Sequence, residues 1–439
     1  IGAPLILEWT HQSTGICNQV KNGIRLIKEK GFFHIIISSS LVKVISFISA
    51  MFLPRVLSKT DYGVLVYVDN IRNYFLMFNA LGITNATLRY CVQEESEEEK
   101  RGVFLYSLRK GLIIDLILFI GSLIFFLCAD FQFQSSRLYL VLMSALPILV
   151  FIYEDLQLYL RALFANREYS ILSFSYSALM VIAQIVLAIT SGILGIIGGR
   201  YIAVIISIVV AIVLLKSVEG KNKKFIYPSK DKQKQIFKFG VVMMLTNMSS
   251  YVMQLNETFI LSWVLNDEED LAVYKVAAYI LTISLFVMQA IITFIFPYFI
   301  KHIDDKKWIW KNFKKLSAIN FGGMLIIHII LIWCTPFIIW LLYGEKYYDA
   351  IPIMRILLVA SFGQAVFRML PGNILAGIGE EKFNLRVNII SMIVHFIIDY
   401  VCVSNYGLLG SAVALIIVYY FSGIIMILHL RNVCKKSQI

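Results

Sequence analysis

Charged side chains interrupt the apolar stretches of this 439-residue chain at positions where they could act on a ligand. Asp69 and Arg72 are three residues apart, so they lie on one face of a helix and can pair. Lys43 has no acid within a helical turn and must face another helix or water. If Lys43, Arg72 and Lys275 face a water-filled cavity, they will attract anions and above all phosphates.

Charges in apolar stretches are functional candidates because each costs about 2.5–3.5 kcal/mol on membrane-insertion scales. Glu257 and Arg368 join the set for this reason. Asp115, Glu154 and others near helix ends have a simpler explanation, since they can pair locally or reach the membrane surface. Arg200 leaves two alternatives open, which are a position at the outer surface and a position facing a cavity.

Composition places these charges in an all-α integral membrane protein. Hydrophobic residues make up 59% of the chain and charged residues 15%, against about 25% charged residues in ordinary soluble domains. This excludes a soluble enzyme, and the 14% aromatic content excludes disorder. The charge-free stretches 169–199, 276–300, 316–344 and 400–430 are each long enough to cross a bilayer. Together with weaker segments they predict about 12 transmembrane helices.

The basic residues indicate how these helices are oriented. Of the 40 Lys and Arg residues, 30 fall in the loops and flanks on the side of the N-terminus and four in the opposite loops. Basic residues collect in cytoplasmic loops. We therefore predict that both termini are cytoplasmic.

The chain divides near its middle. The basic stretch 216–237 is predicted to be a cytoplasmic linker between an N-terminal lobe (35–215, six helices) and a C-terminal lobe (238–430, six helices). Residues 1–34 are predicted to be a cytoplasmic extension, and residues 431–439 a cytoplasmic tail. A Gly-x-x-Gly pattern at Gly192 recurs at Gly407, which favours duplicated lobes related by a pseudo-two-fold axis along the membrane normal.

Several classes of chemistry lack their sequence signatures. No P-loop for an ATP-driven pump is present, and the six cysteines have neither zinc nor redox spacing. We expect no catalytic residue, no metal and no cofactor, and no nucleic-acid partner. The predicted outer loops are short, which disfavours a membrane glycosyl-polymerase.

Short segments spread along the chain carry a resemblance to a known family. They are residues 57–63 (LSKTDYG), 81–83 (LGI), 88–90 (LRY), 342–347 (LYGEKY), 352–357 (PIMRIL) and 405–414 (NYGLLGSAVA). With them, the chain from about residue 35 to 430 resembles polysaccharide (O-antigen type) flippases of the multidrug/oligosaccharidyl-lipid/polysaccharide exporter superfamily.

The resemblance implies a V-shaped molecule with a cationic central cavity, located in the bacterial inner membrane. It implies translocation of an undecaprenyl-pyrophosphate-linked oligosaccharide by alternating access. Lys43, Arg72, Lys275 and Arg368 would bind the substrate in the cavity, and Arg89 would bind it at the cytoplasmic mouth.

Asp69 and Glu257 would be candidates for coupling to H⁺ or Na⁺. Membrane lipids and the polysaccharide polymerase machinery would be the remaining partners. Alternatives remain open: a multidrug or cation antiporter of the same superfamily, an unrelated facilitator of small solutes, a scaffold for assembly enzymes, and the disfavoured glycosyl-polymerase. The sugar composition of the substrate cannot be deduced from these residues.

Overall fold

The computed structural model describes residues 32–219 and 224–436, and all regular structure in these residues is helical. The first part of the chain forms α2 (Phe32–Val56), α3 (Lys59–Leu76), α4 (Ile83–Gln93), α5 (Glu97–Cys128), α6 (Ser136–Met143), α7 (Leu146–Ala162) and α8 (Asn166–Glu219). The second part forms α9 (Lys230–Leu265), α10 (Glu268–Lys301), α11 (Lys306–Tyr343), α12 (Ala350–Gly363), α13 (Leu370–Gly377) and α14 (Glu381–Lys436). Short 3₁₀ turns occur at Asn79–Gly82 and Glu345–Tyr347, and a π-helical turn at Gln364–Met369 joins α12 to α13.

The outer faces of these helices are apolar. Ile117, Ile189 and Trp333 expose 67%, 68% and 82% of their surface, and many other large apolar side chains are exposed with them. Within the described residues, six helical segments are long and apolar enough to cross a membrane. Such continuous exposed apolar surface is compatible with lipid and not with water. The prediction of an all-α integral membrane protein is confirmed.

Two of these segments, α8 and α14, each contain two helices that meet at a sharp turn. The turn in α8 lies at Gly192 (φ 55°, ψ −132°) and the turn in α14 at Gly407 (φ 57°, ψ −139°). Positive φ favours glycine. A Cβ atom on Gly195 would lie 1.8 Å from the Leu187 carbonyl oxygen, and one on Gly410 would lie 2.1 Å from that of Cys402. The recurring Gly-x-x-Gly pattern therefore produces the same tight turn in both places.

Serine side chains accept backbone hydrogen bonds at the N-termini of several helices. Ser96 Oγ accepts a hydrogen bond from the Glu99 backbone N–H at the start of α5, and Ser58 and Ser229 cap α3 and α9 in the same way. The acids Glu97–Glu99 form the first turn of α5, where negative charge complements the helix dipole. This role explains the acidic segment that follows α4.

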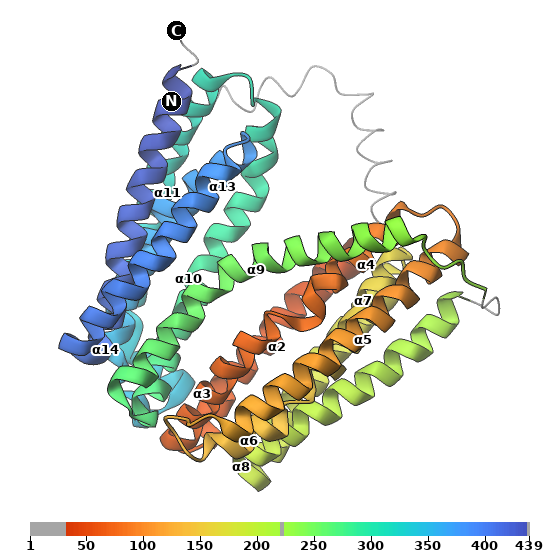
Figure 1. Cartoon of the computed structure of the whole chain (residues 1–439). Helices are drawn as coiled ribbons and strands as arrows, with labels where there is room; N and C mark the ends of the chain where they lie inside the picture. The colour runs from red at the N-terminus through yellow and green to blue at the C-terminus, as the bar shows by residue number, and fades with distance from the viewer. Residues whose placement is uncertain (1–31, 220–223, 437–439) are drawn as a thin grey trace.

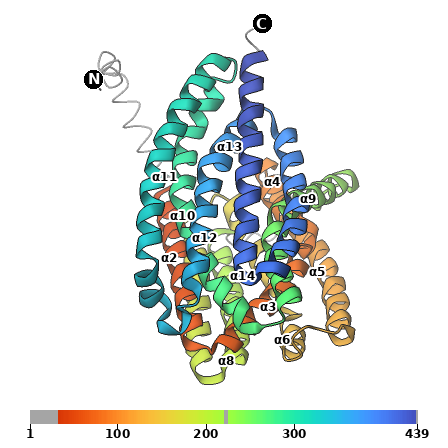
Figure 2. The same cartoon turned by 90° about the vertical axis from the view of Figure 1, so that its left-hand side faces the viewer.

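The helices form two columns that diverge toward one end of the molecule (Figure 1). In the views of Figures 1 and 2, α10, α11, α13 and α14 form one column and α2 to α8 the other. Helix α9 packs against α4 in one column and α14 in the other. A Cβ atom on Gly82 would lie 2.4 Å from the Gly240 carbonyl oxygen, so glycine allows α9 to approach the start of α4 closely.

The observed helix ends differ from the predicted domain limits. Helix α8 continues to Glu219 and α9 begins at Lys230, so the described residues of the predicted linker 216–237 are partly helical. Helix α14 runs to Lys436, well into the predicted tail. Most of the predicted N-terminal extension, residues 1–31, lies outside the described residues.

Candidate functional site

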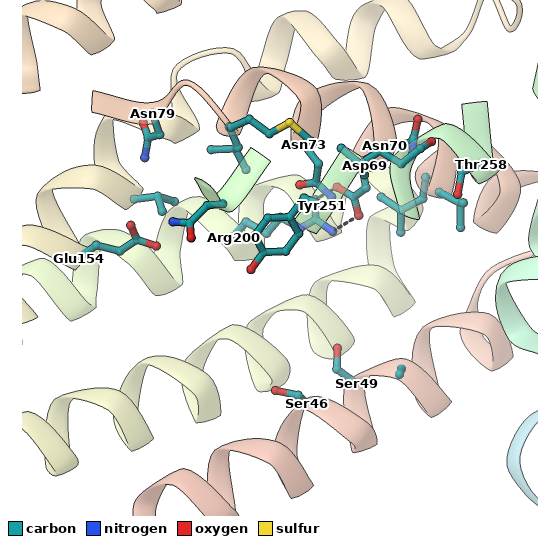
Figure 3. A pocket seen from close by; sticks show the side chains of 18 of the residues that line it. Ser46, Ser49, Asp69, Asn70, Asn73, Asn79, Glu154, Arg200, Tyr251 and Thr258 are labelled. Carbon is teal, nitrogen blue, oxygen red and sulfur yellow. Dashed lines mark hydrogen bonds and ion pairs between the residues drawn. The ribbon is translucent and has the colours of Figure 1, made fainter. Parts of the chain in front are cut away.

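A cavity of about 760 Å³ is enclosed mainly by the column of α2 to α8, and α9 together with Lys275 and Tyr279 of α10 completes its wall. It is lined by α2, α3, α4 and α7 to α10. Amides and hydroxyls dominate its polar surface (Figure 3). The amide groups belong to Asn70, Asn73, Asn79, Asn85, Gln157, Gln184 and Asn247, and the hydroxyl groups to Ser46, Ser49, Tyr62, Thr84, Tyr251, Thr258 and Tyr279. The least apolar helices, α3, α4 and α9, all contribute residues to this lining.

Two hydrogen bonds join α3 to α9 beside the cavity. The Asn70 side-chain amide donates to the Leu255 carbonyl at 3.0 Å, and the Tyr74 hydroxyl donates to Asn256 Oδ1 at 2.8 Å. These side chains have polar partners within the membrane, as buried polar groups require. They fix the wall that carries Asp69.

Asp69 is the centre of a charged cluster at the cavity wall. Arg200 Nη1 and Nη2 donate to its two carboxylate oxygens at 2.5 and 2.7 Å, and Arg200 Nε donates to Gln184 Oε1 at 3.1 Å. Arg72 Nη2 lies 3.5 Å from Asp69 Oδ1. The expected pairing of Asp69 with Arg72 is present, but Arg200 makes the stronger, bidentate contact.

Arg200 is the main residue that the sequence did not assign to the site. It is 7% exposed and is turned toward α3, not toward the membrane surface. The sequence left open which way the Arg200 side chain points. The spacing of residues along α8 or α3 does not determine how one helix is rotated relative to the other. The position of Arg200 directly after the charge-free stretch 169–199 was the sequence feature that could have indicated a role in the site.

The charges lining the cavity include acids as well as bases. Lys275 lies in the lining, is exposed to the cavity, and interacts electrostatically with Asp69. Glu154, which the sequence placed at a helix end, also lines the cavity, and among the described residues it has no ion-pair partner within 4 Å. The lining therefore carries two acids, Asp69 and Glu154, and two bases, Lys275 and Arg200, with Arg72 adding a third base beside Asp69.

Lys43 and Arg89 lie outside this cluster. Lys43 is exposed on α2, one turn from the lining residue Ser46, and its ammonium sits 4.7 Å from the centre of the Phe286 ring of α10. Arg89 is exposed on α4, and its guanidinium sits 4.4 Å from the centre of the Phe239 ring of α9. Each of these cations belongs to the first part of the chain and contacts an aromatic ring on a helix of the second part, α10 or α9.

Glu257 and Arg368 also lie apart from the lining residues. Tyr274 donates a hydrogen bond of 2.9 Å to Glu257 Oε1, and Ser411 donates to the Tyr274 hydroxyl at 3.2 Å. Asp399 is nearby in this interaction network and is fully buried, with no hydrogen-bond partner for either carboxylate oxygen among the described residues. Arg368 donates to Asn388 Oδ1 at 2.9 Å. The structure thus pairs Asp69 with Arg72 and places Lys275 in the cavity lining, where it interacts with both Asp69 and Glu257. Lys43, Arg89 and Arg368 are not lining residues.

The break between α3 and α4 is held by a buried acid. Ala80 and Leu81 both have φ 45°, which is rare outside glycine. The Ala80 N–H donates to Asp115 Oδ1 at 2.6 Å, and Asp115 is 1% exposed. The sequence gave Asp115 a role in local pairing, but its role is to accept from a backbone N–H that the helix break leaves free.

The two parts of the chain also meet at the end where α3 begins, which we call the apex (residues 55–63, 265–270 and 340–349). Lys59 Nζ lies 2.5 Å from Asp349 Oδ2, and Lys346 Nζ donates to the Leu57 carbonyl at 2.5 Å. Partial burial and the Lys59 charge lower the pKa of Lys346. A Cβ atom on Gly63 would lie 1.7 Å from the Glu268 carbonyl oxygen. The apex is therefore closed by polar contacts and close backbone packing.

Solved structures of similar fold are transporters. An inward-facing multidrug resistance MATE family transporter of the MOP superfamily matches with a TM-score of 0.72 and 16% identity, over 92% of this chain and 99% of that one. The lipid II flippase MurJ in an inward closed conformation matches with a TM-score of 0.71 and 14% identity, over 90% of this chain and 87% of that one. At this level of identity the similarity establishes the fold.

Two sequence relatives extend over most of the chain. A Shigella flexneri protein assigned as an O-antigen transporter is 23% identical over 83% of this chain and 88% of its own length. An uncharacterized membrane protein in the cps region of Klebsiella pneumoniae is 24% identical over 87% of this chain and 77% of its own length. The sequence pattern of the family described as polysaccharide biosynthesis protein matches residues 29–302, which is more than half of the chain. The resemblance drawn from the short sequence segments is confirmed. The chain belongs to the polysaccharide biosynthesis protein family.

Proposed function

We propose that this protein is a flippase that moves an undecaprenyl-pyrophosphate-linked oligosaccharide, an O-antigen or capsule repeat unit, across the bacterial inner membrane. The observation that carries the proposal is the cavity, in which amides, hydroxyls and a cluster of cations lie at membrane depth. Amides and hydroxyls exchange hydrogen bonds with sugar hydroxyls, and guanidinium and ammonium groups bind phosphate. Membership of the family and the names of the Shigella and MurJ matches agree with this chemistry.

The proposed architecture has twelve spans in two six-helix lobes, with both termini in the cytoplasm. The equivalent turns at Gly192 and Gly407 support the duplication, and the distribution of basic residues supports the orientation. In this orientation the apex faces the periplasm, and the columns diverge toward the cytoplasm. The oligosaccharide would enter from the side on which lipid-linked precursors are made.

The proposed mechanism is alternating access. The polyprenyl tail stays in the bilayer while the polar head group crosses within the protein. Arg72 and Lys275 replace water around the phosphates, and the amides replace it around the sugars. Release on the other side requires the apex contacts, among them Lys59–Asp349, to break while the columns approach each other at the cytoplasmic end.

Coupling to H⁺ or Na⁺ is proposed at Glu257. Tyr274 donates to its carboxylate, and the buried, unpartnered carboxylate of Asp399 interacts with it. Two neighbouring buried acids are costly unless they share a proton or a cation. Asp69 suits this role less well, because two guanidinium groups already occupy its carboxylate.

The experiment that tests the proposal is a flipping assay in proteoliposomes with a fluorescent undecaprenyl-pyrophosphate oligosaccharide. We expect labelled head groups to become accessible to a membrane-impermeant quencher only in vesicles that contain the protein. The R72Q/K275Q variant, purified and folded, should lose most of this rate. Equal rates in protein-free vesicles, or in vesicles containing the variant, would refute the assignment.

A multidrug or cation antiporter is the second candidate. Glu154 and Asp69 in the cavity favour it, since acids bind cationic drugs, and so does the similarity to the MATE fold. A drug-susceptibility assay in an efflux-deficient strain distinguishes the two. A glycosyl-polymerase is disfavoured, because the loop between α5 and α6 spans only residues 129–135 and offers little room for a catalytic site.

A further inference from the structure

Asp69 pairs with two arginines and interacts with Lys275 at longer range, and these three cations are not equivalent. Every side-chain nitrogen of Arg200 is within hydrogen-bonding distance of a partner, namely Asp69 or Gln184. Arg72 is held loosely, because its Nη2 lies 3.5 Å from Asp69 and 3.4 Å from Asn73, and its buried Nε has no hydrogen-bond partner in the part of the chain that the structure describes. Lys275 faces the cavity without a direct ion pair to any described acid.

This geometry divides the cluster into an anchor and a free part. The bidentate contact fixes Arg200 to α3, and replacing it would cost a well-formed pair in a region of low dielectric. Arg72 loses little if its contact with Asp69 is broken, because that contact is at the long end of ion-pair distances. Arg72 and Lys275 are therefore the cations that an incoming anion can recruit.

We infer that Asp69 is an internal competitor for the phosphate groups of the substrate: it pairs with Arg72 when no substrate is bound and yields Arg72 when pyrophosphate binds beside Lys275. This inference rests on the proposed function, since it concerns the same site. The phosphate groups would take two of the three cations, and Arg200 would keep the Asp69 carboxylate.

The physical reason for an acid at such a site is release. A cavity with three uncompensated cations would bind a pyrophosphate tightly in both the inward-facing and the outward-facing state. A flippase must let the ligand go after each crossing, so excess affinity slows it. A tethered carboxylate lowers the affinity by the free energy needed to displace it, and it also stabilises the arginines when no substrate is present.

The test measures binding of inorganic pyrophosphate to the purified full-length protein in nanodiscs by calorimetry, without divalent cations. Asp69→Asn should bind pyrophosphate about tenfold more tightly than the unaltered protein, since one charged contact no longer has to be displaced. Glu154→Gln is the matched control, because it removes the same charge from the same cavity lining and, among the described residues, Glu154 forms no ion pair with an arginine. It should change the dissociation constant less than threefold.

Arg72→Gln provides a variant that keeps the Asp69–Arg200 pair and hence the fold. It should bind pyrophosphate about tenfold more weakly, and the double variant D69N/R72Q should lose the gain seen in Asp69→Asn. The inference is overturned if Asp69→Asn binds no more tightly, if Glu154→Gln tightens binding equally, or if Arg72→Gln binds like the unaltered protein. If Asp69→Asn does not fold, the Arg72→Gln result decides.

The two proposals can fail separately. If Asp69→Asn tightens pyrophosphate binding but the unaltered protein does not flip lipid-linked oligosaccharide, the competitor role stands and the flippase assignment falls. If the protein flips the lipid but Asp69→Asn does not tighten binding, the opposite holds. In the flipping assay Asp69→Asn should also lower the maximal rate while lowering the half-saturating substrate concentration, a combination that loss of folded protein does not produce.

Discussion

Arg200 donates two hydrogen bonds to Asp69, at 2.5 and 2.7 Å, across 131 positions of the chain. The pair joins the second half of α8 to the middle of α3 at the wall of the cavity. The pair lowers the cost of burying both charges, and it fixes the position of the carboxylate that Arg72 also contacts.

Removing this pair should destabilise the protein. Arg200→Gln leaves Asp69 with only the looser contact to Arg72, and breaking a buried pair costs about 3–5 kcal/mol. Arg200→Lys keeps the charge but not the bidentate geometry and should lose less. The thermal unfolding midpoint of purified protein in detergent should fall in the order unaltered protein, Arg200→Lys, Arg200→Gln. Equal midpoints for all three would contradict the role given to the pair.

Close packing at the apex should make Gly63 intolerant of a side chain. In Gly63→Ala the new Cβ would lie 1.7 Å from the Glu268 carbonyl oxygen, so α3 and α10 would have to separate. Both the thermal midpoint and the flipping rate should drop. Gly121→Ala in α5 is the control, because nothing lies within 4 Å of its Cβ position, and helix propensity should favour it by about 0.5–1 kcal/mol. An equally harmless Gly63→Ala would contradict the packing.

The apex contact between Lys59 and Asp349 should be broken during transport. In a protein whose six native cysteines are replaced by Ala, K59C/D349C treated with a short, reducible bis-thiol reagent should stop flipping, and reduction should restore it. The pair D130C/R137C is the control, since Asp130 in the loop after α5 and Arg137 at the start of α6 form an ion pair within the first part of the chain. Continued flipping with the K59C/D349C cross-link fully formed would rule out opening at the apex.

The break between α3 and α4 should depend on Asp115 as a hydrogen-bond acceptor. Asp115→Ala leaves the Ala80 N–H without its partner, which costs about 1–3 kcal/mol. Asp115→Asn retains an acceptor oxygen and should be closer to the unaltered protein. Hydrogen–deuterium exchange of residues 78–83 should rise in Asp115→Ala more than in Asp115→Asn. Unchanged exchange in both variants would show that the break is held by other contacts.

The sequence by itself determined the class of the protein and the order of its helices. Hydrophobic stretches of membrane length and the two Gly-x-x-Gly turns depend on local properties, which are the lipid solubility of a segment and the backbone freedom of a residue. For the same reason the sequence identified Asp69 and Arg72 as a pair, because an i,i+3 spacing is fixed within one helix.

The tertiary structure decided which charges meet across helices. Each helix can rotate about its axis without changing its own sequence pattern, so the direction of Arg200, Glu154 and Asp115 depends on packing against neighbours far along the chain. The same packing placed Lys275 near Asp69 and left Glu257 and Arg368 apart from the cavity lining. Long-range contacts set the site, because the cost of burying a charge is offset only by the partner that the fold brings to it.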